Sequence, residues 1–72
     1  MAEKIVELGK VGAIGAWTEG EAAAPESGGR CRIYNSQDEL VGCRNLPSEE
    51  KCQQWAQYKG AWGYAWAPGS SC

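Results

Sequence analysis

The stretch Cys52-Gln-Gln-Trp-Ala-Gln-Tyr-Lys-Gly-Ala-Trp-Gly-Tyr-Ala-Trp66 decides where this chain places its largest side chains. It holds three of the four tryptophans and two of the three tyrosines. Aromatic rings are the largest apolar surfaces in a protein, and Trp and Tyr each keep one polar atom that needs a partner or water. The stretch therefore predicts a core, a binding platform, or both.

The first half of this stretch predicts a short helix. Pro47 or Ser48 would begin it, and the two glutamates that follow lie where the helix dipole favours negative charge. Gly60 is the expected stop, since glycine readily adopts the left-handed conformation that ends helices. A helical wheel separates two faces, one with Cys52, Trp55, Ala56 and Lys59, the other with Glu50, Gln53, Gln54 and Gln57.

The second half predicts a strand. Trp62, Tyr64 and Trp66 alternate with small residues, which sets all three rings on one face. We expect Trp55 and Trp62 to serve as core, because the chain has no Phe and few aliphatic residues in this region. Tyr58 and Trp66, near the ends of their elements, are the rings expected to be partly exposed, and exposed aromatic surface usually marks an interface.

Upstream, the segment 30–44 predicts a β-hairpin. Its two arms alternate apolar and polar residues, and the loop 35–39 reads Asn-Ser-Gln-Asp-Glu, which is turn chemistry. Pairing the arms about Gln37 sets Cys31 directly opposite Cys43. Two cysteines facing each other across such a pair lie within bridging distance.

Four cysteines in 72 residues, with no Cys-x-x-Cys pair and no histidine, argue against a zinc ribbon or a redox motif. An even count in a short chain predicts two disulfides formed in an oxidising compartment. Three pairings are open, and the hairpin register favours Cys31–Cys43 with Cys52–Cys72. The alternative is a four-thiolate iron–sulfur cluster, which only the number of cysteines supports.

The sequence predicts one domain in three parts. Residues 1–18 form a strand-like segment, because three glycines disfavour a helix there and suggest a kink. Residues 19–29 are acidic and rich in small residues, which predicts a flexible loop. Residues 30–72 form a cysteine-stapled core. The predicted class is small α+β, a disulfide-stapled β-hairpin with one short helix and a C-terminal aromatic strand.

Charge and hydropathy restrict the partners. The net charge is −2, and residues 28–72 carry five basic against four acidic groups, too little for a nucleic-acid footprint. No stretch is apolar enough to span a membrane, and no signal peptide is recognisable in the chain as given. The cysteines favour an extracellular or other oxidising location. The oligomeric state cannot be read from the sequence.

For function, the sequence favours a non-enzymatic binding module for a protein or carbohydrate partner, without catalytic residues, metal or cofactor. The alternative is a structural or accessory subunit of a larger assembly, with the aromatic face buried against neighbours. An enzymatic alternative is a small subunit whose Trp and Cys side chains become a quinone or thioether cofactor. Residues 31–72 are similar in style to small secreted cysteine-stapled proteins, a likeness that carries no functional residues. The candidate binding residues are Tyr58, Trp62, Tyr64 and Trp66.

Overall fold

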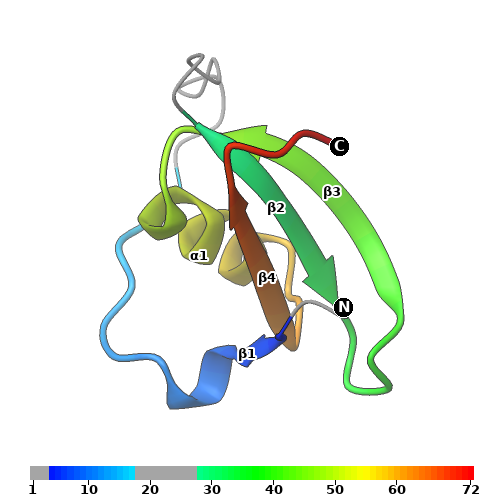
Figure 1. Ribbon diagram of the computed structural model, residues 1–72. Helices are drawn as coiled ribbons and strands as arrows, with labels where there is room; N and C mark the ends of the chain where they lie inside the picture. Colours follow the sequence, from blue (N-terminus) through cyan, green and yellow to red (C-terminus); the bar gives the residue numbers. More distant parts are fainter. Residues whose placement is uncertain (1–3, 18–27) are drawn as a thin grey trace.

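The computed structural model describes residues 4–17 and 28–72. Within these ranges, four strands form one antiparallel sheet in the order β1-β4-β2-β3, with one α-helix packed on one face (Figure 1). Together with two disulfides, this is the small stapled α+β fold that the sequence predicts. The elements are β1 (Val6–Glu7), the short 3-10 helix η1 (Leu8–Lys10), β2 (Gly29–Tyr34), β3 (Leu40–Leu46), α1 (Glu49–Tyr58) and β4 (Gly63–Pro68).

The core lies between the helix and the central strands β2 and β4. Cys31 pairs with Trp66 and Ile33 with Tyr64, so these four side chains share the face of the sheet that meets the helix. Opposite them, Cys52, Trp55 and Ala56 of α1 are buried, and all three belong to the helix face that the sequence grouped with Lys59. The buried apolar residues are Cys31, Ile33, Leu46, Cys52, Trp55, Ala56, Tyr64 and Ala65.

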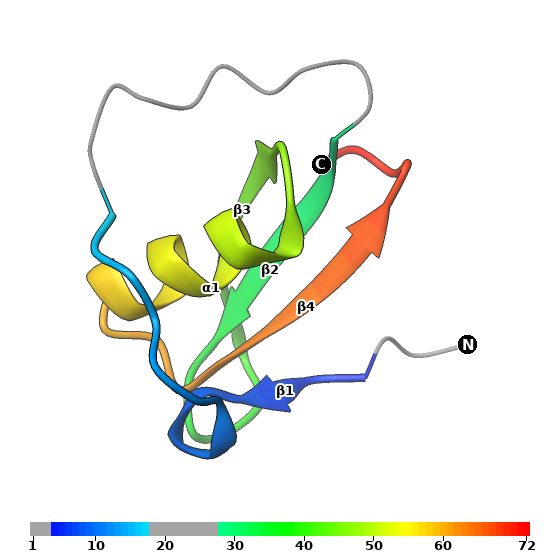
Figure 2. The same ribbon diagram turned by 90° about the vertical axis from the view of Figure 1, so that its left-hand side faces the viewer.

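The helix begins and ends where the sequence predicts. The Ser48 hydroxyl accepts a hydrogen bond from the Lys51 amide at 3.3 Å, which caps the first turn. Gly60 follows the last turn with φ +74°, a conformation that residues with a side chain rarely adopt. Gln54 differs from the prediction, because it is only 8% exposed. The segment 11–17 runs alongside α1 and covers this residue (Figures 1 and 2).

The hairpin has the predicted five-residue loop, which Asn35 organises. The Asn35 side-chain oxygen accepts hydrogen bonds from the Gln37 and Glu39 amides, and its backbone N–H donates to the Glu39 carbonyl. These bonds engage the backbone N–H groups of Asn35, Gln37 and Glu39 in a loop that contains no glycine. The local sequence therefore determines the loop, because an Asn side chain in a turn commonly bonds the backbone that follows it.

Beyond the loop, the strand register differs from the predicted one. Tyr34 pairs with Leu40 as expected, but Ile33 pairs with Gly42 and not with Val41. Val41 is the extra residue of a β-bulge, and one extra residue moves every later side chain to the other face of the sheet. Cys43 consequently pairs with Arg32, and the position opposite Cys31 belongs to Arg44.

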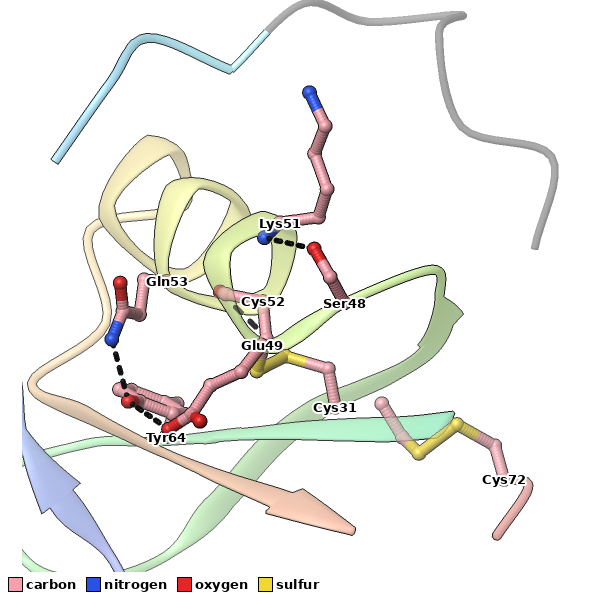
Figure 3. The surroundings of a disulfide bond; sticks show 9 residues. Cys31, Ser48, Glu49, Lys51, Cys52, Gln53, Tyr64 and Cys72 are labelled. Atoms are coloured by element: carbon pink, nitrogen blue, oxygen red, sulfur yellow. Dashed lines mark hydrogen bonds between the residues drawn. A yellow bond between two sulfur atoms is a disulfide. The ribbon is translucent and has the colours of Figure 1, made fainter. Parts of the chain in front are cut away.

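The bulge explains why the favoured disulfide pairing is wrong. Cys31 and Cys43 point to opposite faces of the sheet, so Cys31 bonds Cys52 on the helix and Cys43 bonds Cys72. Figure 3 shows the Cys31–Cys52 bridge between β2 and α1, with Cys72 set apart from it. All four cysteines are oxidised, as predicted, and the two closed loops interlace along the chain.

Within residues 4–17, the N-terminal segment is a strand for two residues only. β1 pairs Val6 with Tyr64 and Glu7 with Gly63, and the chain then turns through η1 at Gly9. The loop predicted at 19–29 falls mostly outside the described residues, although Gly29 already belongs to β2. No helix within the described ranges is long and apolar enough to cross a membrane.

We expect the two disulfides to open in a fixed order under native conditions. Cys31 and Cys52 are fully buried, whereas Cys43 is partly exposed and Cys72 exposed, so a thiolate can reach only the second bridge. Limited dithiothreitol followed by alkylation and mass spectrometry should label Cys43 and Cys72 first. In denaturant, the difference should vanish. Early labelling of Cys31 and Cys52 in the folded protein would contradict the burial of their bridge.

Trp55 should contribute most to stability among the tryptophans. Its side chain is 6% exposed and packs in the core beside the buried bridge. We expect Trp55→Ala to lower the free energy of unfolding by about 3–5 kcal/mol in denaturant titrations. Trp62→Ala, at a position that is 36% exposed, should cost less than about 1 kcal/mol. Equal losses at both positions would show that Trp62 also belongs to the core.

Candidate binding surface around Trp62

Trp62 stands at the entry to β4 and is held by main-chain bonds on both sides. Its N–H donates to the Tyr34 carbonyl at 2.9 Å, and its carbonyl accepts from the Leu8 N–H at 3.0 Å. The first bond ties it to the end of β2 and the second to the start of η1. A tryptophan that is 36% exposed is thus fixed on a firm backbone, contrary to its expected place in the core.

A shallow groove of about 380 Å³ lies beside Trp62. β1 can approach β4 closely there because Gly63 has no side chain: a Cβ at that position would lie 2.8 Å from the Val6 carbonyl oxygen. The groove therefore depends on a glycine in the aromatic strand and on the two-residue pairing of β1. Its lining residues are Lys4, Ile5, Val6, Glu7, Lys10 and Trp62.

The groove combines an apolar wall with a charged rim. Lys10 forms an ion pair with Glu7 at 3.4 Å. Within the described ranges, no carboxylate lies at ion-pair distance from the Lys4 ammonium group. Lys4, Lys10 and Glu7 together give the groove a charge of +1, opposite in sign to the net charge of −2 of the chain.

The four predicted binding residues do not form one surface. Tyr58, near the end of α1, is exposed, and Lys59 lies 5.8 Å from its ring centroid. Trp66 is partly exposed, as expected, but packs against the core. Tyr64 is buried at 1% exposure. Trp62 is the member of the set that lines the groove.

Tyr64 connects the sheet to the helix. Its hydroxyl donates to the Glu49 carboxylate at 2.8 Å and accepts from the Gln53 amide at 2.8 Å (Figure 3). Burial, the largest cause, raises the pKa of Tyr64, and the Glu49 carboxylate raises it further by favouring the protonated phenol. The Gln53 bond favours the phenolate and lowers this pKa in part. The role of Tyr64 is therefore structural, because its hydroxyl links β4 to α1.

Two tryptophans and an arginine form a cluster between segment 11–17 and α1, which the sequence did not predict. The Arg44 guanidinium lies 5.1 Å from the ring centroid of Trp17 and 6.0 Å from that of Trp55. Cation–π contacts of this kind contribute about 0.5–1 kcal/mol or more when desolvated. Arg44 reaches these rings because the bulge turns it toward the helix. The cluster fastens segment 11–17 over α1.

Sequence reasoning missed the groove residues Lys4, Ile5, Val6 and Lys10. Lys4 to Glu7 read charged, apolar, apolar, charged, so they show no alternation, and a strand of two residues is too short to leave a periodic pattern. No group of three metal-ligating side chains lies close together in the described part of the chain. Comparison with known protein families, curated proteins and solved structures found no match.

Removing the Tyr64 hydroxyl should destabilise the protein measurably. Tyr64→Phe leaves Glu49 and Gln53 without their shared partner, and we expect a loss of about 1–2 kcal/mol in denaturant titrations. Tyr58→Phe is the matched control, since the Tyr58 ring is exposed, and should change stability by less than about 0.5 kcal/mol. A loss of equal size in both variants would contradict a structural role for the Tyr64 hydroxyl.

The raised pKa of Tyr64 also predicts an alkaline effect. The folded state holds this proton more tightly than the unfolded state, so its contribution is complete below the unfolded pKa of about 10. Stability should fall as the pH rises above that value toward the folded pKa. Thermal melts of the wild type between pH 8 and about 12 should show this loss. Tyr64→Phe should show a smaller loss, and identical profiles would refute the linkage.

Proposed function

We propose that the protein is a non-enzymatic binding module whose contact surface is the Trp62 groove. The observation that carries the proposal is a large aromatic side chain, partly exposed beside a groove and fixed by two main-chain hydrogen bonds. Trp is over-represented among the residues that dominate binding energy, and a preformed anchor loses little conformational freedom on binding. The partner is a protein or a carbohydrate.

The disulfides support an extracellular or otherwise oxidising setting for this module. Two bridges in a chain of 72 residues are compatible with a compartment where thiols oxidise. A stapled scaffold can present an exposed ring without relying on that ring for stability. In this proposal, Trp55 and Tyr64 stabilise the fold, and Trp62 contacts the partner.

A structural subunit of a larger assembly is the second candidate. Leu40 and Val41 are both more than half exposed at the start of the edge strand β3, on the opposite edge of the sheet from β1. Such a pair suits a permanent contact with a neighbouring chain. Light scattering coupled to size exclusion separates the two candidates, because a structural subunit alone should self-associate through this edge.

Selection against random peptide and glycan libraries tests the binding proposal. Ligands selected with the wild type should lose most of their affinity for Trp62→Ala, by about tenfold or more. Leu40→Ala is the matched control, since it removes exposed apolar surface at the opposite edge of the sheet and should keep the affinity within about twofold. Tyr58→Ala, measured alongside, tests the predicted contribution of that ring.

Two results would contradict this proposal. One is the absence of any ligand from libraries that yield binders for a control domain in the same format. The other is a set of ligands that bind Trp62→Ala as well as they bind the wild type. Circular dichroism of the variant should show the native fold in either case, because Trp62 is not a core residue.

A further inference from the structure

We infer that the groove beside Trp62 receives an extended, acidic segment of another protein, which adds as a strand to the free edge of β1. This inference rests on the proposed function and names the partner class for the same surface. Three features carry it: the open edge of β1, the charge of Lys4, which has no carboxylate at ion-pair distance in the described ranges, and the apolar wall of Ile5, Val6 and Trp62.

The first feature is the position of β1 in the sheet. Among the described residues, it is the terminal strand of the order β1-β4-β2-β3, and Val6 and Glu7 pair it with β4 alone. Figure 2 shows β1 at the margin of the fold, without a further described strand beside it. The main-chain groups on such an edge can pair with an incoming extended chain. The groove follows the same residues, because four consecutive positions, 4–7, line it.

The second feature is electrostatic. Glu7 already compensates Lys10, whereas Lys4 has no such partner in the described ranges. A carboxylate on the ligand would compensate Lys4 and complete a balanced set of charges around the groove. A basic segment would instead add like charge beside two ammonium groups. The sign of the groove therefore selects an acidic partner, although the chain as a whole is acidic.

The third feature separates a peptide from a sugar. Besides its three charged side chains, the groove offers Ile5, Val6 and Trp62, which are apolar surfaces. A sugar ring brings hydroxyl groups around its edge, and those that face Ile5, Val6 and the Trp62 ring would lose water there without gaining a partner. A peptide strand instead satisfies its polar main chain on β1 and places apolar side chains against Trp62. The expected sequence alternates acidic and apolar residues.

The dimensions of the surface set the strength of binding. A groove of about 380 Å³ and a two-residue edge strand fall below the size of a standard protein interface. We therefore expect dissociation constants in the micromolar range or weaker, on the order of 10–1,000 µM. Such affinities are measurable by NMR titration of the labelled protein.

The test uses three capped hexapeptides of alternating composition, (Glu-Val)3, (Gln-Val)3 and (Lys-Val)3. The glutamate peptide should shift the Trp62 indole signal and the amide signals of residues 4–8. It should bind about tenfold or more tightly than the lysine peptide, with the glutamine peptide between them. A glutamate peptide N-methylated along one edge keeps its side chains but loses strand pairing, and should bind at least about tenfold more weakly.

Charge reversal at two lysines provides the matched variants. Lys4→Glu changes the groove, whereas Lys59→Glu makes the same change of net charge beside Tyr58, outside it. We expect Lys4→Glu to weaken the glutamate peptide by about tenfold or more and to strengthen the lysine peptide. Lys59→Glu should alter neither by more than about twofold. Equal effects of both variants would show that the preference for the glutamate peptide depends only on the net charge of the protein, and would overturn the inference.

Further outcomes also overturn it, and they are distinguishable from failure of the binding proposal. Stronger shifts at Trp62 with the lysine peptide, with cellohexaose or with a heparin hexasaccharide would refute an acidic peptide while leaving the groove a binding site. Shifts confined to Leu40, Val41 and their neighbours would place peptide binding at the other edge of the sheet. No shift with the glutamate peptide at millimolar concentration would refute this inference, while library selection tests the binding proposal separately.

Discussion

The disulfide between Cys31 and Cys52 is the constraint on which the rest of the structure depends. It joins the central strand β2 to the first half of helix α1, and both of its cysteines are completely buried. A chain of 72 residues buries a smaller share of its surface than a larger domain does, so a covalent bridge supplies a large part of its stability. Trp55 and Tyr64 pack in the same core as the bridge. The Tyr64 hydroxyl also links β4 to the helix through hydrogen bonds with Glu49 and Gln53.

The bulge at Val41 determines which cysteines can meet. By moving Cys43 to the face opposite Cys31, it separates the two sulfurs that a regular hairpin would place together. Cys43 then holds the C-terminal residue Cys72, whose N–H also donates to the Asn45 side chain. Because the two loops interlace, either bridge alone keeps the hairpin joined to the part of the chain that follows it. Each contributes about 3–4 kcal/mol by restricting the unfolded chain.

Local chemistry made much of this fold predictable. Ser48 and Gly60 mark the helix ends, Asn35 marks the hairpin loop, and the even cysteine count indicates two bridges. The bulge was not predictable, since Val41 fits a regular strand equally well and only tertiary packing selects the register. Gln54 looked solvent-facing because segment 11–17, which covers it, has no periodicity of its own. Alternation could not show which of Trp62 and Trp66 is more exposed, because Trp62 lies just before β4 and Trp66 lies within it.

The same arrangement places the candidate binding surface away from the groups that stabilise the fold. Trp62 and the groove lie at the β1 edge, while the bridges fasten β2 and β3. The most direct test of this account is disulfide mapping of the oxidised protein. Trypsin after thiol blocking puts each cysteine in its own peptide, at residues 31–32, 33–44, 52–59 and 60–72. The account predicts that 31–32 is linked to 52–59 and that 33–44 is linked to 60–72. A link between 31–32 and 33–44 would show a hairpin without the bulge and would contradict the account.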